Sequence, residues 1–251
     1  MHQHIYNGRF NTILDGEKFL ETQLDELLQS GKVKLLQNKE DDSIVQLLYA
    51  DENYELGFMG IIKDKNDDTS TLYPLSFNGT KAEVIIDEIS VLSTGIEAII
   101  YCHLFQEPSF GFYFFDTNFI ANIDRYVIGE SYKFSFYGFA YNIAKSNITN
   151  QTIPLEDDQT ISLKDATIFL PIDEAEDDKD HYKIHSTVSN ITTSNYIDNE
   201  IVKVDFKLYD NEENGFSIPI YTKSTNISSD IQLLDGEHLS CVAWICGVCY
   251  E

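Results

Sequence analysis

The chain contains two stretches that look like copies of one β-rich unit, and this internal repeat constrains the possible folds more than any other feature. In each copy, two runs rich in isoleucine and aromatic residues are followed by a Gly-Glu pair and a last run of the same kind. The matched runs are 96–105 with 201–209, 112–117 with 217–222, and 132–137 with 238–246. Because such residues favour strands over helices, each copy is expected to be an antiparallel β unit.

The expected units lie at 71–150 and 167–251. The runs at 71–75 and 167–172 have a similar character and would begin the two copies. Pro74 and Pro171 are closer together in the sequence than Gly129 and Gly236 are, so the copies would be related only with insertions between the matched points. Chance similarity between two β-rich segments is the alternative.

Each unit offers four or five short strands and a loop or short helix before its last strand. The OB-fold is a small barrel of this kind, and residues 118–125 occupy the place of its helix. A sandwich is the alternative architecture for the same pattern. We therefore expect two related OB-like or sandwich-like units.

Residues 1–66 predict a different arrangement, a helix on a small antiparallel sheet. Asp15 is a suitable N-cap and Gly31 a suitable end for a helix from Gly16 to Ser30. Its apolar residues form one stripe that we expect to be core: Phe19, Leu20, Leu24, Leu27 and Leu28. Strand-like runs follow at 33–37, 44–50 and 54–62, and the polar stretch 64–70 would end the segment. The fold class is therefore mostly β (α+β).

The charge of the chain restricts its partners. It has 42 acidic and 17 basic residues, for a formal net charge of −25 at pH 7. Such a charge repels phosphate backbones and anionic lipids, so duplex DNA and a membrane surface are not expected partners. A basic protein is the expected partner, and simple solubility is the alternative explanation of the charge. The sequence does not indicate an oligomeric state.

The amino-terminal residues lack the basic and apolar regions of a signal peptide, and no apolar run approaches the length that spans a bilayer. We therefore expect a cytoplasmic protein with reduced cysteines. Cys102, Cys241, Cys246 and Cys249 lie in apolar runs, which predicts buried structural thiols. A zinc site and a redox function are the alternatives for these cysteines.

No cofactor or metal site is predicted. The segment from Asp64 begins like a calcium-binding loop, but Thr69 stands where the turn needs glycine and Leu75 where the ion needs glutamate. His181 and His185 have the spacing of a helical zinc site. On a strand, however, they would lie about 13 Å apart, so they cannot share an ion and are expected at the surface.

The usual catalytic motifs are missing from the sequence, so an enzyme would need a non-standard site where carboxylates and a histidine such as His103 converge. An OB-like unit raises a second possibility, because aromatic side chains on such a sheet can stack nucleic-acid bases. The candidate set alternates along two strands and has no basic cluster beside it, which favours core packing: Phe110, Phe112, Phe114, Tyr132, Phe134 and Phe136.

Part of the chain resembles a pattern found in uncharacterised β-rich, acidic bacterial proteins. The resemblance rests on three segments: Phe114-Phe-Asp-Thr-Asn-Phe119, Tyr126-x-x-Gly-Glu-x-Tyr-x-Phe134, and Ala140-Tyr141. A late Trp-x-x-Gly segment closes those proteins, as Trp244 to Gly247 does here. The resemblance covers about residues 71–251, and its motifs are structural, so it implies no assigned activity.

The leading hypothesis is a non-enzymatic, acidic protein-binding module, such as an immunity-type inhibitor of a basic toxin or nuclease. Opposite charges would speed its association with the partner. The alternatives are an OB-like accessory protein that binds single-stranded nucleic acid, and an enzyme with a non-standard site. The candidate partner-binding residues lie in acidic loops: Asp64, Asp67, Asp68, Asp173, Glu174, Glu176, Asp177 and Asp178.

Overall fold

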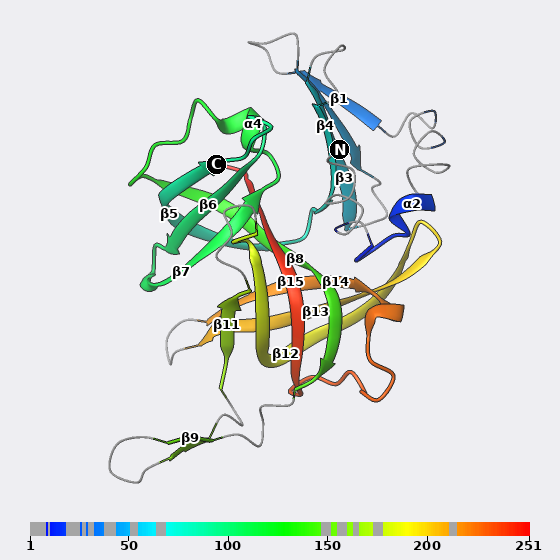
Figure 1. Cartoon of the computed structure of the whole chain (residues 1–251), viewed down its shortest axis with the longest axis vertical. Coiled ribbons are helices and arrows are strands. Elements are labelled where there is room, and N and C mark those ends of the chain that lie inside the picture. The colour runs from blue at the N-terminus through cyan, green and yellow to red at the C-terminus, as the bar shows by residue number, and fades with distance from the viewer. Residues whose placement is uncertain are drawn as a thin grey trace.

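The computed structural model shows a mostly β protein (Figure 1). It describes residues 9, 11–18, 26, 29, 33–37, 44–50, 55–63, 69–146, 152–154, 160–162, 166–172, 178–210 and 215–251. None of the helices in these ranges has the length and apolar character that crossing a bilayer requires.

A small antiparallel sheet forms from the first four strands in chain order. These are β1 (Val33–Gln37), β2 (Ile44–Ala50), β3 (Leu56–Lys63) and β4 (Thr69–Ser76). The expected antiparallel sheet is thus confirmed, but it has one more strand than the pattern predicts. The run at 71–75, expected to begin the first β unit, lies in β4 and pairs with β3 instead.

The helix expected from Gly16 to Ser30 is not shown as a whole. The structure describes α2 (Gly16–Lys18) and assigns helical backbone to Glu26 and Gln29, and the rest of the segment lies outside the described residues. The side chain of Asp15 accepts a hydrogen bond of 3.2 Å from the Lys18 amide, as an N-cap does.

A nine-stranded mixed sheet contains strands of both expected β units. The first unit contributes β5 (Thr80–Val91), β6 (Ala98–Leu104), β7 (Glu107–Asp116), the short helix α4 (Phe119–Asn122) and β8 (Ser131–Lys145). The second contributes β11 (Ile168–Pro171), β12 (His181–Tyr196), β13 (Asn199–Asp210), β14 (Gly215–Lys223), the 3-10 helix η3 (Ser224–Asn226) and β15 (His238–Cys249). Strands β9 (Thr152–Pro154) and β10 (Thr160–Ser162) form a separate ladder. The expectation of antiparallel units is wrong where β14 pairs with β8 and β15 pairs with β7 in parallel.

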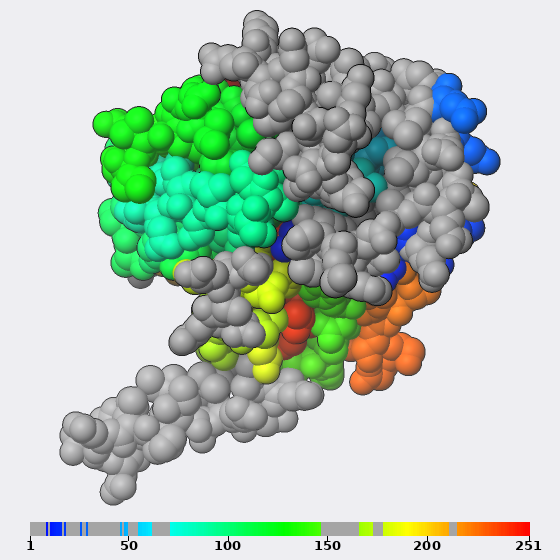
Figure 2. Space-filling view, turned by 45° about the horizontal axis from the view of Figure 1, so that its top comes forward, coloured from blue at the N-terminus to red at the C-terminus, as the bar shows by residue number. Residues whose placement is uncertain are grey.

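The large sheet closes on itself twice, because the long strands β8 and β15 pair with each other and also with strands of both units. One closed ring has the order β5-β6-β7-β15-β8, and the other has the order β12-β13-β14-β8-β15. Each ring therefore takes one strand from the other unit. The first ring and the second ring share the β8–β15 ladder, which crosses the middle of Figure 1. In Figure 2 the coloured atoms of the two units lie next to each other on the face shown.

The turns before β8 and β15 make the same backbone hydrogen bonds. Gly129 and Gly236 both have positive φ, at 90° and 87°, a conformation that glycine adopts without steric cost. The amide of Gly129 donates to the carbonyl of Ile86, and the amide of Gly236 donates to that of Val188, both at 2.8 Å. The Gly-Glu pairs of the sequence therefore occupy matching places in the two units.

The interiors of both rings form one continuous hydrophobic cluster. Phe112, Phe114, Phe134 and Phe136 are almost completely buried in it, which confirms the expected core packing of these side chains. A second cluster lies between the outer face of the rings and the small sheet, and its largest members are aromatic: Tyr49, Phe58, Tyr73, Phe115, Tyr137 and Trp244.

The four cysteines are free and buried, which confirms the prediction of structural thiols. Burial raises the pKa of each thiol above its ordinary value, and for Cys241 it is the single cause. Raised pKa values keep the sulfur atoms protonated at neutral pH, and a protonated thiol is a poor nucleophile.

Candidate functional site

A hollow of about 310 Å³ lies where the small sheet meets the first ring. The small sheet supplies Leu48, Met59 and Leu75, and the first ring supplies Tyr137 and Val248. The other lining residues are Ser76, Phe77, Lys81, Thr117, Asn118, Ser135 and Tyr250. The wall is therefore mainly apolar, and Lys81 is the one charged residue among its described members.

Two aromatic side chains on the lining of the hollow are strongly exposed. Phe77 is 47% exposed and Tyr250 is 40% exposed, although most large aromatic residues of the described chain are buried. Phe77 rests on Gly57, where an added Cβ would lie 2.9 Å from the ring. The ammonium group of Lys81 lies 5.0 Å from the centre of the Tyr250 ring, within the range of a cation–π contact.

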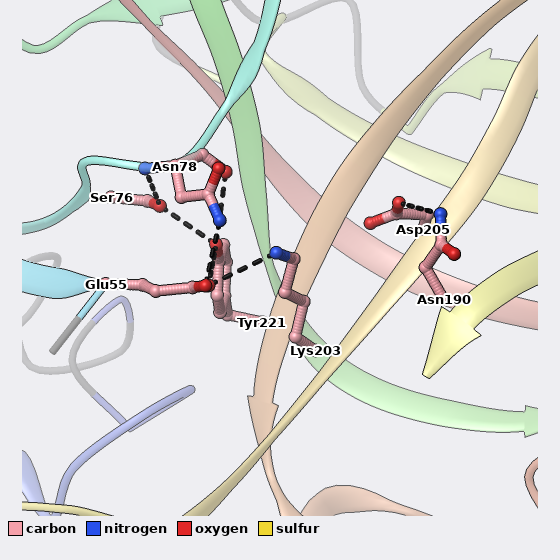
Figure 3. A network of polar contacts seen from close by, with 7 residues as sticks. All are labelled: Glu55, Ser76, Asn78, Asn190, Lys203, Asp205 and Tyr221. Carbon is pink, nitrogen blue, oxygen red and sulfur yellow. Dashed lines mark hydrogen bonds and ion pairs between the residues drawn. The ribbon is translucent and has the colours of Figure 1, made fainter. Parts of the chain in front are cut away.

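A polar network fixes one end of the β4–β5 turn that carries Phe77 (Figure 3). The carboxylate of Glu55 accepts hydrogen bonds from Asn78 at 2.8 Å, Tyr221 at 3.1 Å and Lys203 at 3.2 Å. Partial burial opposes the charge of Glu55, but the bonds from Asn78, Lys203 and Tyr221 outweigh it and lower the pKa of this carboxyl group. The network thus joins the small sheet to β13 and β14 of the second ring.

The same network holds the backbone of the turn. The amide of Phe77 donates to the carbonyl of Glu55 at 2.8 Å, and the Ser76 hydroxyl donates to the Tyr221 hydroxyl at 3.0 Å. The turn then passes close to β8 at Gly79, where an added Cβ would lie only 2.5 Å from Ser135 Oγ. Phe77 is therefore exposed on a rigid support, which lowers the entropy lost when it packs against a partner.

The polar groups at the inner end of the hollow are largely used within the protein. The Thr117 hydroxyl contacts the Tyr137 hydroxyl at 3.0 Å and donates to the carbonyl of Gly247 at 3.1 Å. The carbonyl of Thr117 accepts from the Tyr73 hydroxyl at 2.9 Å. The hydroxyls of Thr117 and Tyr137 are therefore already paired, and together with the mainly apolar wall this suits the hollow to an apolar group.

A carboxylate lies in the chain directly before Thr117. The side chain of Asp116 accepts hydrogen bonds from the Tyr126 hydroxyl at 2.6 Å and from the Asn118 amide at 2.9 Å. Burial raises the pKa of Asp116 to about 7, although these two hydrogen bonds act in the opposite direction. Asp116 therefore binds a proton at a higher pH than an exposed aspartate does.

A second polar cluster lies where the amino-terminal segment meets β8 and β15. Asp180 is fully buried, accepts a hydrogen bond of 2.6 Å from Trp244 Nε1, and lies 3.8 Å from the Arg9 guanidinium. Its other oxygen contacts His181 Nδ1 at 2.9 Å, and His181 Nε2 contacts the Tyr141 hydroxyl at 2.8 Å. The order hydroxyl, imidazole and carboxylate is that of an activated nucleophile. Burial, however, raises the pKa of Tyr141, so its hydroxyl stays protonated and the cluster acts as an anchor.

The acidic residues expected to contact a partner lie mostly outside the described residues: Asp64, Asp67, Asp68, Asp173, Glu174, Glu176 and Asp177. Asp178 is described and exposed, 3.7 Å from His181 Nδ1, and it does not line the hollow. The hollow itself has no signal in the sequence, because Phe77 and Tyr250 are single aromatic residues outside any periodic pattern.

The histidines differ from expectation. His185, expected at the surface, is completely buried, and its ring packs against that of His238. His103, the histidine named for an enzyme site, contacts Asp87 at 2.6 Å and does not line the hollow.

No protein-family model matches the chain, and a search of the curated proteins finds no significant match.

Proposed function

We propose that this protein is a non-enzymatic binding protein that presents an acidic surface to a basic protein, as an immunity-type inhibitor does, and that the hollow receives an apolar side chain of that partner. The observation that carries the proposal is the pair of exposed aromatic residues, Phe77 and Tyr250, beside an apolar hollow on a chain of net charge −25. The setting we propose is the bacterial cytoplasm.

The distribution of positive charge supports a basic partner. Among the described residues, five basic side chains form ion pairs with acidic ones: Arg9, Lys133, Lys179, Lys203 and Lys207. Each pair neutralises one basic and one acidic residue, so the excess of 25 acidic residues, which is set by the sequence, is unchanged. An acidic field of this kind speeds the approach of a basic protein and rejects acidic ones.

The acidic surface and the aromatic residues beside the hollow act on different steps of binding. Surface charge mainly sets the association rate and its dependence on salt. A rigid aromatic anchor beside a pocket mainly sets the dissociation rate, since buried aromatic contacts dominate binding energies. A volume of about 310 Å³ is at the lower end for ligand pockets, so the hollow is suited to one or two side chains of a partner.

A second function is favoured by the strand order. In each ring, three consecutive strands are followed by a short helix and a fourth strand, and a strand of the other unit lies between the third and the fourth. This is the arrangement of an OB-like barrel. Such barrels bind single-stranded nucleic acid by aromatic stacking beside basic groups. Of the six aromatic residues expected on this face, four are buried and only Phe110 and Tyr132 are partly exposed. We therefore prefer the protein partner.

The experiment is a pull-down of the tagged full chain from its native lysate, with and without nuclease. We expect a basic protein that is retained after nuclease treatment and released by moderate salt. Phe77→Ser should weaken this complex about 30-fold, as the loss of a binding hot spot does. Phe105→Ser is the matched control, because Phe105 is 51% exposed and does not line the hollow.

Two results would overturn the proposal. Co-purified nucleic acid that disappears with nuclease would favour the OB-like alternative. An unchanged affinity of the purified partner for the Phe77→Ser variant would show that the hollow is not part of the interface.

A further inference from the structure

His185 and His238 lie next to each other although they are far apart in the sequence. Antiparallel pairing of β12 with β15 places His185 opposite Ser240 and Thr187 opposite His238. Ile184 and Cys241 point into the ring interior, so the alternating positions His185 and Ser240 face outward. The two imidazole rings are 5.3 Å apart between centres and inclined by 36°.

Each imidazole has one nitrogen in contact with a hydroxyl and one nitrogen with no partner among the residues that the structure describes. His185 Nδ1 contacts Ser240 Oγ at 3.4 Å, and His238 Nε2 contacts Thr187 Oγ1 at 2.9 Å. His185 Nε2 and His238 Nδ1 are buried and make no hydrogen bond within the described part of the chain. A buried polar atom without a partner destabilises the folded state, so two such atoms on neighbouring rings point to a missing ligand.

The contacts of the two rings match those of metal-binding histidines. A ring whose one N–H donates to an oxygen keeps a lone pair on the other nitrogen, and ligating histidines are oriented by such second contacts. In both rings one nitrogen already contacts a hydroxyl, so His185 Nε2 and His238 Nδ1 are the nitrogens left to bind a cation.

The spacing of the rings also fits one shared ion. Nitrogen–metal bonds of about 2.0–2.1 Å at a tetrahedral angle place the centres of two imidazoles about 5.2 Å apart. The observed separation of 5.3 Å agrees with this value. His181, which lies four residues before His185 in the sequence, contacts Tyr141 and Asp180 and is not part of the pair.

We propose that His185 Nε2 and His238 Nδ1 bind one divalent transition-metal ion on the outer face of the second ring. Imidazole nitrogen selects zinc, copper and nickel over magnesium and calcium. The described residues contain no group of three or more histidine, cysteine or carboxylate side chains that would hold a metal. This part of the chain therefore supplies two ligands, and water molecules or a small anion complete the coordination.

The test is a calorimetric titration of the full chain with zinc chloride at pH 7.4, in which magnesium should give no signal. We expect one zinc ion per chain and at least tenfold weaker binding in His185→Gln and in His238→Gln. His103→Gln is a control at an imidazole outside the pair. The double variant His2→Gln/His4→Gln tests the amino-terminal histidines, and it should keep the site. Absence of zinc binding, unchanged affinity in both test variants, or loss of binding in the double variant would refute the proposal.

A second measurement needs no substitution and so does not depend on the folding of a variant. Long-range ¹H–¹⁵N spectra of the wild-type histidine rings distinguish Nδ1 from Nε2. Zinc should shift one Nε2 and one Nδ1 that belong to two different buried rings. Shifts confined to solvent-exposed rings, or no shifts at all, would show that the pair does not bind the metal.

Discussion

Arg9 is expected to be one of the most important single side chains for stability, and its replacement by methionine tests this directly. Its guanidinium is 3.8 Å from the fully buried carboxylate of Asp180 and lies over the rings of Trp244 and Phe115. Burial opposes the charge of Arg9, yet the nearby Asp180 carboxylate raises the pKa of Arg9 above its ordinary value. Methionine keeps the apolar contacts and removes the charge.

The magnitude follows from the contacts that remain. Removing one member of a buried ion pair costs about 3–5 kcal/mol, because the other charge stays buried without its partner. Asp180 keeps its bonds to Trp244 and His181, so we expect a loss of about 3 kcal/mol, at the lower end of that range. For a chain of this size that loss lowers Tm by about 6–12 °C.

The assay is urea unfolding followed by tryptophan fluorescence, since Trp244 is the one tryptophan and contacts both members of the pair. Arg125→Met is the matched control, because Arg125 is exposed, and it should change stability by less than about 0.5 kcal/mol. The double variant Arg9→Met/Asp180→Asn should be more stable than the sum of its single changes predicts by about 1 kcal/mol or more. A loss below 1 kcal/mol for Arg9→Met, or strict additivity, would refute the reasoning.

Three further predictions concern turns, protonation and thiols. Gly129→Ala and Gly236→Ala should each lower the free energy of unfolding in urea by about 1–2 kcal/mol, because both positions have positive φ. An added Cβ would meet nothing within 4 Å at either position, so no clash adds to this backbone strain. Clearly unequal losses would count against equivalent turns. Burial raises the pKa of Asp116 to about 7, so the native state binds more protons than the unfolded chain between about pH 4 and 7, and the free energy of unfolding should fall as pH rises through this window. Asp116→Asn should flatten this pH dependence. An unchanged slope in the variant would contradict the assignment. The buried cysteines should react with a thiol reagent only on unfolding, and rapid reaction of the native protein would show that they are accessible.

The strands were predictable from the sequence because side-chain alternation is a local property. The bounds expected for β1 and β2 agree with the structure, and the Gly-Glu pairs mark matching turns. The choice of partner strand is not local. The run in β4 alternates in a way that suits either sheet, and the pairing of Pro74 with Phe58 in the small sheet is set by contacts between distant segments.

The candidate sites were less predictable for the same reason. Phe77 becomes part of a hollow only when the β4–β5 turn and the carboxyl-terminal Tyr250 come together in the fold. Alternation correctly separates His185 from the interior position of Ile184, but it cannot show that the outer face is covered there. The neighbour of His185 is His238, which only the pairing of β12 with β15 reveals.

The exchange of strands between the two rings has a consequence for synthesis on the ribosome. Strand β15 is the last strand of the sheet to be made, and both rings need it to close. One edge of β7 and one edge of β8 therefore stay without β15 while about 100 further residues are translated. This takes on the order of 5–20 s. During this interval the nascent chain exposes the aromatic interior of an open sheet, a state that aggregates easily and that chaperones recognise.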